Sequence, residues 1–194
     1  FHKPTANSAE FWVKPYLELF RLIRHFGSLK FDELKMFGLQ LVDYREFDTI
    51  VEKINQFRIA KAQNEGNYKR FRAEYFDREL REIYSVDISS GNTKTRETND
   101  ASIANFLSTK ASNMRDYADA CVRYLRATGL VNISHIGKSL SIVPEKIQEV
   151  DYFLQHTDRE PCFIDNEGQY VAYLGNPLIL TLLTDNRELL DQKI

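Results

Sequence analysis

The order of secondary structure predicted between residues 101 and 155 constrains this sequence more than any other feature. An amphipathic helix ends at Thr128-Gly129, and two short segments of alternating apolar and polar residues follow it, on either side of a turn at 135–138. Alternation with a period of two predicts a β-hairpin. Pro144 then opens another helix, at about 145–155. A helix, a short hairpin and a further helix follow one another in this order in winged-helix units, so the pattern favours that fold.

The helix before the hairpin is the clearest in the sequence. Its apolar residues recur at helical spacing and form one stripe: Met114, Ala118, Cys121 and Leu125. Helical periodicity begins earlier, at Ala101, and the polar stretch 108–112 predicts a break between the two segments. Thr109 and Ser112 are suitable N-caps for the second segment.

Residues 11–84 predict further amphipathic helices joined by short turns. Apolar residues recur every three or four positions in four segments, at about 11–26, 31–41, 47–57 and 68–84. The sequence therefore predicts a mainly α protein with a small β-hairpin, a helical bundle followed by a winged-helix-type unit. We expect a bundle subdomain at 1–66, a winged-helix-like subdomain at 67–156 and a C-terminal extension at 157–194.

Composition argues against several classes of protein. No run of 18 apolar residues occurs, so we expect no membrane span. Two cysteines in unrelated contexts and four histidines without ligand spacing argue against a disulfide scaffold and a metal site. A reducing, cytoplasmic setting fits this composition. The first residues include neither an initiator Met nor a signal peptide, which suggests a fragment or a processed product.

Charge is distributed unevenly along the chain. The formal net charge of −2 predicts no general affinity for nucleic acid. Residues 1–143, however, contain 22 Lys and Arg against 18 Asp and Glu, whereas residues 144–194 contain 4 against 10. A surface that binds a polyanion is therefore expected before Pro144.

The helix before the hairpin is the element expected to read DNA. The major groove, about 12 Å wide, admits one helix, whose N-terminal residues reach the base edges. Asn pairs with adenine and Arg or Lys with guanine, and the candidates here are Lys110, Ser112, Asn113 and Arg115. His135 and Lys138 lie at the hairpin tip, where they would meet phosphates. Lys94 and Arg96 lie in the polar stretch 85–100, which is able to order on a phosphate backbone.

Each of these groups also has an interpretation without DNA. Arg115, Asp119 and Arg123 are spaced by four and would form a ladder of ion pairs. The stretch 85–100 equally suits a linker, the hairpin tip a solvated turn, and many winged helices bind protein. A second charged ladder is predicted on the helix at 68–84, from Arg70, Glu74, Arg78 and Glu82.

One short motif resembles a nuclease signature and is set aside. Glu33-Leu34-Lys35 matches the Glu-x-Lys of magnesium-dependent nucleases, but it lies in a helical pattern where that motif needs a strand. Cys121 lies on an apolar stripe and is predicted to pack in the core. We therefore expect no catalytic residue, no metal and no cofactor in this chain.

Three motifs together resemble one family of DNA-cutting enzymes. The first is Trp12-Val13-Lys14-Pro15-Tyr16 through Phe26-Gly27-Ser28-Leu29, followed by Ile54-Asn55-Gln56-Phe57-Arg58. The second is Met114-Arg115-Asp116-Tyr117-Ala118-Asp119-Ala120, then Arg123-Tyr124-Leu125-Arg126-Ala127-Thr128-Gly129-Leu130. The third is Tyr173-Leu174-Gly175-Asn176-Pro177. In their order and spacing, over about residues 11–177, they resemble the AlwI-type restriction endonucleases and their BstNBI-like nicking relatives.

The resemblance implies a type IIS enzyme. Such enzymes recognise a short asymmetric duplex site through winged-helix subdomains and cut at a fixed distance with a separate C-terminal nuclease domain that needs a metal, Mg²⁺. This chain would be the second part of the recognition region, with double-stranded DNA and that nuclease domain as its partners. The family's nuclease motif has no counterpart here, so the resemblance transfers binding and not cutting. The alternatives are a winged-helix transcription regulator and a protein-interaction domain.

Overall fold

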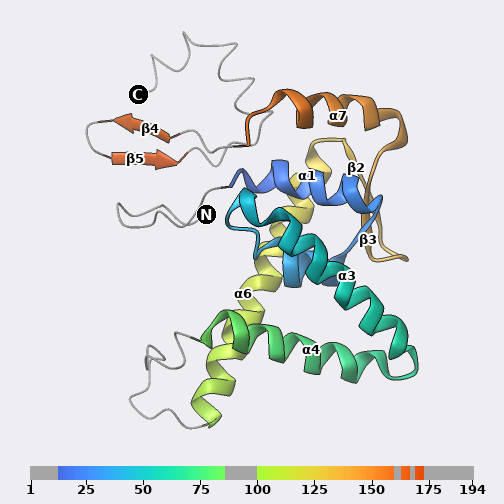
Figure 1. Cartoon of the computed structure of the whole chain (residues 1–194), viewed down its shortest axis with the longest axis vertical. Coiled ribbons are helices and arrows are strands. Elements are labelled where there is room, and N and C mark those ends of the chain that lie inside the picture. The colour runs from blue at the N-terminus through green and yellow to red at the C-terminus, as the bar shows by residue number, and fades with distance from the viewer. Residues whose placement is uncertain (1–12, 86–99, 160–162, 167–168, 173–194) are drawn as a thin grey trace.

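The computed structural model describes residues 13–85, 100–159, 163–166 and 169–172 (Figure 1). Its helices are α1 (Pro15–Phe26), α2 (Phe31–Glu33), α3 (Phe47–Gln63), α4 (Tyr68–Ile83), α6 (Asp100–Ala127) and α7 (Ile147–His156). Shorter helical turns lie at Leu34–Gly38, Tyr44–Glu46, Glu65–Asn67 and Pro144–Lys146. The first of these, a π-helical turn, continues α2 directly. The prediction of a mainly α chain with a small hairpin is confirmed.

The predicted hairpin forms, and a third strand joins it. β2 (Val131–Ser134) and β3 (Ser139–Ile142) pair antiparallel around the turn at 135–138. β1 (Leu29–Lys30) pairs with β3 through Leu29↔Leu140 and Lys30↔Ser139, so the sheet order is β1-β3-β2. The sequence predicts only a connection between two helices at Leu29, and this prediction is wrong. Two residues are too few to show an alternating pattern, and the strand depends on hydrogen bonds from β3.

A second, two-stranded sheet lies near the C-terminal end of the described chain. β4 (Phe163–Asn166) pairs antiparallel with β5 (Gln169–Ala172), with Phe163 opposite Ala172. The sequence predicts only a C-terminal extension for this part of the chain, with no strands assigned to it. The rest of the expected C-terminal extension, including the motif at 173–177, lies outside the described residues.

α6 is continuous from Asp100 to Ala127, so the predicted break at 108–112 is wrong. The segment contains neither Gly nor Pro. Thr109 does not cap a new helix, because its hydroxyl donates to the carbonyl of Asn105 at 3.0 Å, one turn earlier within the same helix. The buried stripe also runs through the expected break, from Leu107 to Ala118 and Leu125. With 28 residues at about 1.5 Å each, α6 is about 42 Å long.

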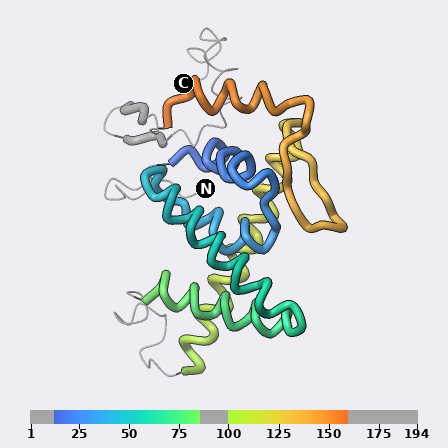
Figure 2. The backbone as a smooth tube through the Cα atoms, turned by 45° about the vertical axis from the view of Figure 1, so that its right-hand side comes forward, coloured from blue at the N-terminus to red at the C-terminus, as the bar shows by residue number. Residues whose placement is uncertain are grey.

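The core is centred on α1, which lies between α7 and the rest of the molecule (Figures 1 and 2). Leu17, Leu22 and Ile23 of α1 are almost completely buried. They belong to one apolar cluster that includes Leu140 of the sheet and Leu125 of α6. Burial of each such side chain contributes about 1.5–3 kcal/mol. The sheet and this cluster take residues from both sides of the boundary expected at residues 66–67, and a functional division there stays a prediction.

α3, α4 and the first half of α6 form a helical extension away from α7 (Figure 1). Aromatic rings join α3 to α4: Phe57 stacks on Phe71 at 6.0 Å and meets Tyr75 edge-on at 5.1 Å. The charged ladder predicted on α4 forms only in part. Arg70 pairs with Glu74 at 2.7 Å, whereas the Arg78 guanidinium lies over the Tyr75 ring at 4.3 Å. Of the helices the structure describes, none combines the length and the apolar character needed to cross a membrane.

Candidate nucleic-acid interface

The tip of the β2–β3 hairpin is held in a defined shape by two backbone constraints. The Gly137 N–H donates to Ser134 Oγ at 2.9 Å, and a Cβ at position 137 would lie 2.8 Å from that oxygen. A larger residue at position 137 would therefore have to displace the Ser134 side chain. Lys138 adopts the left-handed conformation, with φ +47°, which is uncommon outside glycine. His135, Ile136 and Lys138 are all exposed at this tip.

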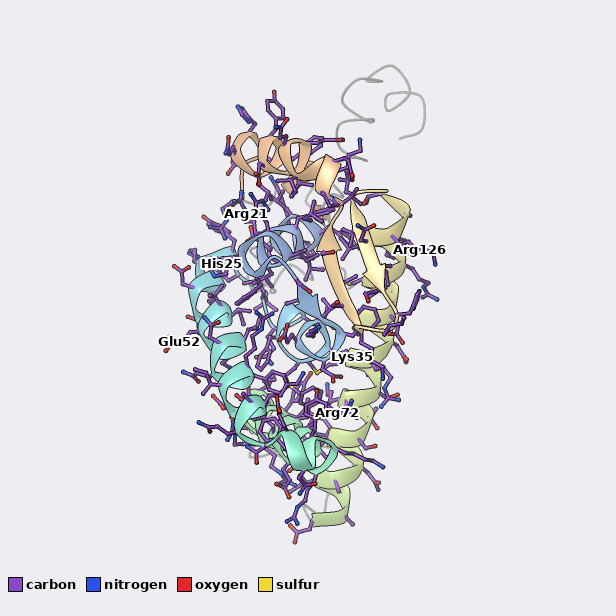
Figure 3. All side chains as sticks on the ribbon, turned by 90° about the vertical axis from the view of Figure 1, so that its right-hand side faces the viewer. Arg21, His25, Lys35, Glu52, Arg72 and Arg126 are labelled. Atoms are coloured by element: carbon purple, nitrogen blue, oxygen red, sulfur yellow. The ribbon has the colours of Figure 1, made fainter. Side chains whose placement is uncertain are left out.

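The start of α2 fastens this turn from the side. The Phe31 N–H donates to the Lys138 carbonyl at 2.8 Å. The Lys30 ammonium donates to the Gly137 carbonyl at 3.3 Å, which places a second lysine at the tip, with Lys138 and His135. Figure 3 shows Lys35 on the same side of the molecule, below the hairpin tip. The structure therefore brings together the two predicted tip residues and adds cations from a segment more than 100 residues earlier.

The second half of α6 presents an exposed polar face beside the sheet. Its exposed residues include Ser112, Asn113, Arg115, Asp116, Asp119, Arg123 and Arg126, together with Tyr117 and Tyr124. Figure 3 shows Arg126 projecting outward on the side where the hairpin lies. The ladder that the spacing of Arg115, Asp119 and Arg123 suggests does not form. None of these three makes an ion pair or side-chain hydrogen bond with another residue that the structure describes.

The predicted residues on α6 lie in the middle of the helix and not at its N-terminus. Since α6 begins at Asp100, Ser112 and Asn113 are more than three turns inside it. The free N–H groups and the positive end of the helix dipole therefore lie elsewhere. Ser112 and Asn113 remain exposed, and only their side chains are available to a ligand.

Lys110 faces a different neighbour. Its ammonium lies 4.8 Å from the Tyr84 ring centroid and 5.1 Å from that of Phe106, so it closes the junction of α4 and α6. A cation above aromatic faces is held electrostatically, by about 0.5–1 kcal/mol at exposed sites. Lys94 and Arg96 lie outside the described residues, and their role stays a prediction.

Sequence reasoning missed Lys30, Ile136 and Arg126 at this surface. No local signal identifies Lys30, because only the pairing of β1 with β3 places it beside the hairpin tip. Arg126 and Ile136 are visible in the sequence, at the last turn of the helix and at the centre of the predicted turn. Helical phase relative to the apolar stripe would have marked Arg126 as exposed.

In the Glu33-Leu34-Lys35 motif, Glu33 forms a structural ion pair with Arg58. Glu33 is almost completely buried and accepts two hydrogen bonds from Arg58, at 2.7 and 2.8 Å, and one from the Lys30 N–H at 2.8 Å. Arg58 also donates to the Ser28 carbonyl at 2.8 Å and lies over the Phe26 ring at 4.3 Å. Both carboxylate oxygens of Glu33 are thus committed to joining α1, α2 and α3. The part of the chain that the structure describes has no group of three or more His, Cys, Asp or Glu arranged to hold a metal ion.

Cys121 lies against the apolar core on the inner side of α6. Burial raises the pKa of its thiol above the ordinary value. A raised pKa reduces the fraction of reactive thiolate. The prediction that this cysteine packs in the core is confirmed.

A comparison with protein families places the chain among enzymes that cut DNA. The family model that matches is described as AlwI restriction endonuclease, and it matches residues 2–193, nearly the whole chain. The chain therefore belongs to the AlwI restriction endonuclease family, and the resemblance drawn from its sequence is confirmed. No curated protein matches it. Membership of this family implies DNA as the substrate.

Proposed function

We propose that this chain recognises a specific sequence in double-stranded DNA, as the recognition region of a type IIS restriction or nicking endonuclease. The observation that carries the proposal is the topology around the sheet. α1, β1 and α2 are followed, after the inserted helices α3 and α4, by α6, β2 and β3, and β1 completes the sheet in the order β1-β3-β2. This order of helix, strand, helix, helix and hairpin supports a winged-helix unit, in which the β2–β3 hairpin would be the wing.

In this proposal the second half of α6 enters the major groove. Asn113 and Arg115 are exposed and form no side-chain hydrogen bond or ion pair with another residue that the structure describes, and they are suited to adenine and guanine edges. Asp116 and Asp119 repel phosphates but accept hydrogen bonds from the amino group of cytosine. A face that carries both positive and negative charges favours particular base edges over the uniformly negative DNA backbone. We therefore expect this face to contribute more to specificity than to affinity.

The wing and its neighbours contact the backbone in the same proposal. His135, Lys138 and Lys30 surround the hairpin tip, and Arg126 lies at the last turn of α6. Phosphate contacts fix the register of the protein on the duplex, while base contacts carry the sequence information. We extend the backbone contacts to Lys94 and Arg96, which lie in the segment that precedes α6.

We assign DNA cleavage to a C-terminal nuclease domain of the same polypeptide, with Mg²⁺ as its metal. Two of the three buried carboxylates that the structure describes support the assignment, because each is engaged by an arginine: Glu33 by Arg58 and Glu18 by Arg159. Those pairs join helices and leave neither carboxylate free for a metal. Restriction enzymes act on DNA inside the cell, and a cytoplasmic location follows from the same proposal.

A binding titration tests the proposed function. Fluorescence anisotropy with labelled duplex DNA at two salt concentrations should show weak binding that falls steeply with salt, because bound phosphates release counterions. Lys138→Ala should weaken binding to all sequences alike and lower the salt slope by about one unit. Lys69→Ala, at an exposed lysine at the start of α4, is the matched control and should leave the slope unchanged.

Three outcomes would overturn parts of this proposal. Absence of binding at low salt would favour a protein-interaction domain. Specific binding by a parent protein without a nuclease domain would favour a transcription regulator. Reproducible Mg²⁺-dependent cleavage by this chain, abolished by a substitution within it, would place the catalytic centre here.

A further inference from the structure

Ile136 at the tip of the wing is the starting observation. It is completely exposed, at 101% of the reference value, and exceeds every other large apolar residue that the structure describes as exposed; Ile59 on α3 follows at 61%. Single exposed apolar residues are common on proteins. Exposure alone therefore does not indicate a binding site. The evidence for one has to come from the residues around Ile136.

Those surroundings present the side chain and do not bury it. The turn is held by the hydrogen bonds from Gly137 to Ser134 and from Phe31 to Lys138, so the tip is supported from both sides. Isoleucine is stiff because its Cβ is branched. The tip therefore holds a rigid apolar side chain away from the body of the molecule.

Two lysines flank this apolar side chain. Lys138 follows it two residues later, and the Lys30 ammonium donates to the Gly137 carbonyl between them, while the imidazole of His135 precedes it. The minor groove of DNA has the complementary layout, with phosphates along both edges and stacked bases at its floor. Proteins that kink DNA insert apolar side chains between base pairs there, while their cations contact the flanking phosphates.

We propose that Ile136 is an apolar wedge that enters the minor groove and opens a base step, which bends the bound duplex. The inference rests on the proposed function. With α6 in the major groove, the hairpin beside it reaches across one phosphate strand, and the groove beyond that strand is the minor groove. The wedge favours sites with a flexible pyrimidine–purine step at this place, so it contributes specificity without a hydrogen bond to a base.

The experiment compares three variants with the unchanged chain: Ile136→Ala, Ile136→Lys and the control Ile59→Ala. Duplexes are first enriched from a random library by the chain itself and then labelled at both ends. Energy transfer between the labels reports bending, and anisotropy reports affinity in the same samples. The unchanged chain and Ile59→Ala should shorten the distance between the ends. Ile136→Ala should lose most of the bend and about tenfold in affinity.

Ile136→Lys separates a wedge from a residue that merely approaches the backbone. An added cation should keep or raise affinity through a phosphate contact, yet the bend should be lost because a lysine does not hold the bases apart. Unaltered bending in Ile136→Ala and Ile136→Lys, with binding intact, would overturn the wedge and leave the proposed function standing. No binding by the unchanged chain would overturn both.

Discussion

Arg159 donates two parallel hydrogen bonds to Glu18 across 141 residues of sequence, from Nε to Oε1 at 3.0 Å and from Nη2 to Oε2 at 2.7 Å. Glu18 lies on the buried side of α1, and Arg159 follows the end of α7. Arg159 also donates to the Tyr44 carbonyl at 3.1 Å and lies 5.3 Å from the Phe47 ring centroid. One side chain therefore joins the chain after α7 to α1 and to the start of α3.

Arg159→Ala should destabilise the fold strongly. The substitution leaves the Glu18 carboxylate buried, with Arg21 at 3.6 Å as its remaining cation. A buried charge that loses its partner costs about 3 kcal/mol or more. Urea denaturation should show this loss in the free energy of unfolding. Arg70→Ala, which removes an exposed partner of Glu74, is the control and should change stability far less. Equal effects of the two substitutions would contradict the structural role of the Glu18–Arg159 pair.

Asp151→Asn should destabilise the protein at neutral pH and not in acid. Arg24 on α1 donates to both Asp151 oxygens, at 2.7 and 3.0 Å, and these hydrogen bonds hold the pKa of the Asp151 carboxyl below its ordinary value. A carboxyl whose pKa is lower in the folded state stabilises it above the unfolded pKa, near about 4. That contribution disappears as pH falls through the folded pKa.

Urea midpoints at two pH values test this prediction. The variant should have a lower midpoint than the unchanged protein at pH 7, and the two midpoints should converge at about pH 2. A difference of the same size at both pH values would show that the variant disturbs packing of α7 on α1 and not the ion pair.

Gly38→Ala should destabilise the protein, although alanine is usually preferred to glycine within a helix. A Cβ at position 38 would lie 2.9 Å from Leu34 Cδ1 and 3.1 Å from Leu19 Cδ2. Both leucines are buried and have little room to move. Overpacking of this kind costs about 1–3 kcal/mol.

Gly66→Ala is the matched control for that substitution. Nothing lies within 4 Å of a Cβ at this exposed position. Reduced freedom of the unfolded chain should then stabilise the protein by about 0.4–1 kcal/mol. The midpoints of thermal and urea unfolding should therefore both fall for Gly38→Ala and both rise for Gly66→Ala. A stabilising effect of Gly38→Ala would show that the two leucines repack freely.

If the proposed function holds, Asn113→Ala or Arg115→Ala should relax recognition at one base pair. If either side chain pairs with a base, its loss costs about 1–3 kcal/mol of binding to the correct site. Sites selected from a random library should then show one degenerate position. Folding should be unaffected because both side chains are exposed. If both variants select the same DNA sites as the unchanged protein, the residues that recognise bases lie on another part of the surface.

Local patterns in the sequence account for much of the fold. The hairpin at 131–142 was predictable because alternation and a glycine-containing turn are both properties of a dozen adjacent residues. The C-terminal end of α1 was predictable for the same kind of reason, since Gly27 adopts φ +69°, whereas the helix begins at Pro15 and not at about residue 11 as the periodicity predicts. Three spaced motifs were also sufficient to indicate the family.

Tertiary structure alone decided the features that shape the candidate interface. β1 exists because β3 supplies its hydrogen bonds, and this pairing places Lys30 at the tip of the β2–β3 hairpin. α6 is unbroken because α4 covers its first half and the sheet its second, while the polar residues at 108–112 lie largely outside the buried stripe. Ion pairs such as Glu18–Arg159 join segments that are distant in sequence. Amino-acid order carries the local preferences of the backbone, but contacts between distant segments form only when the chain closes on itself.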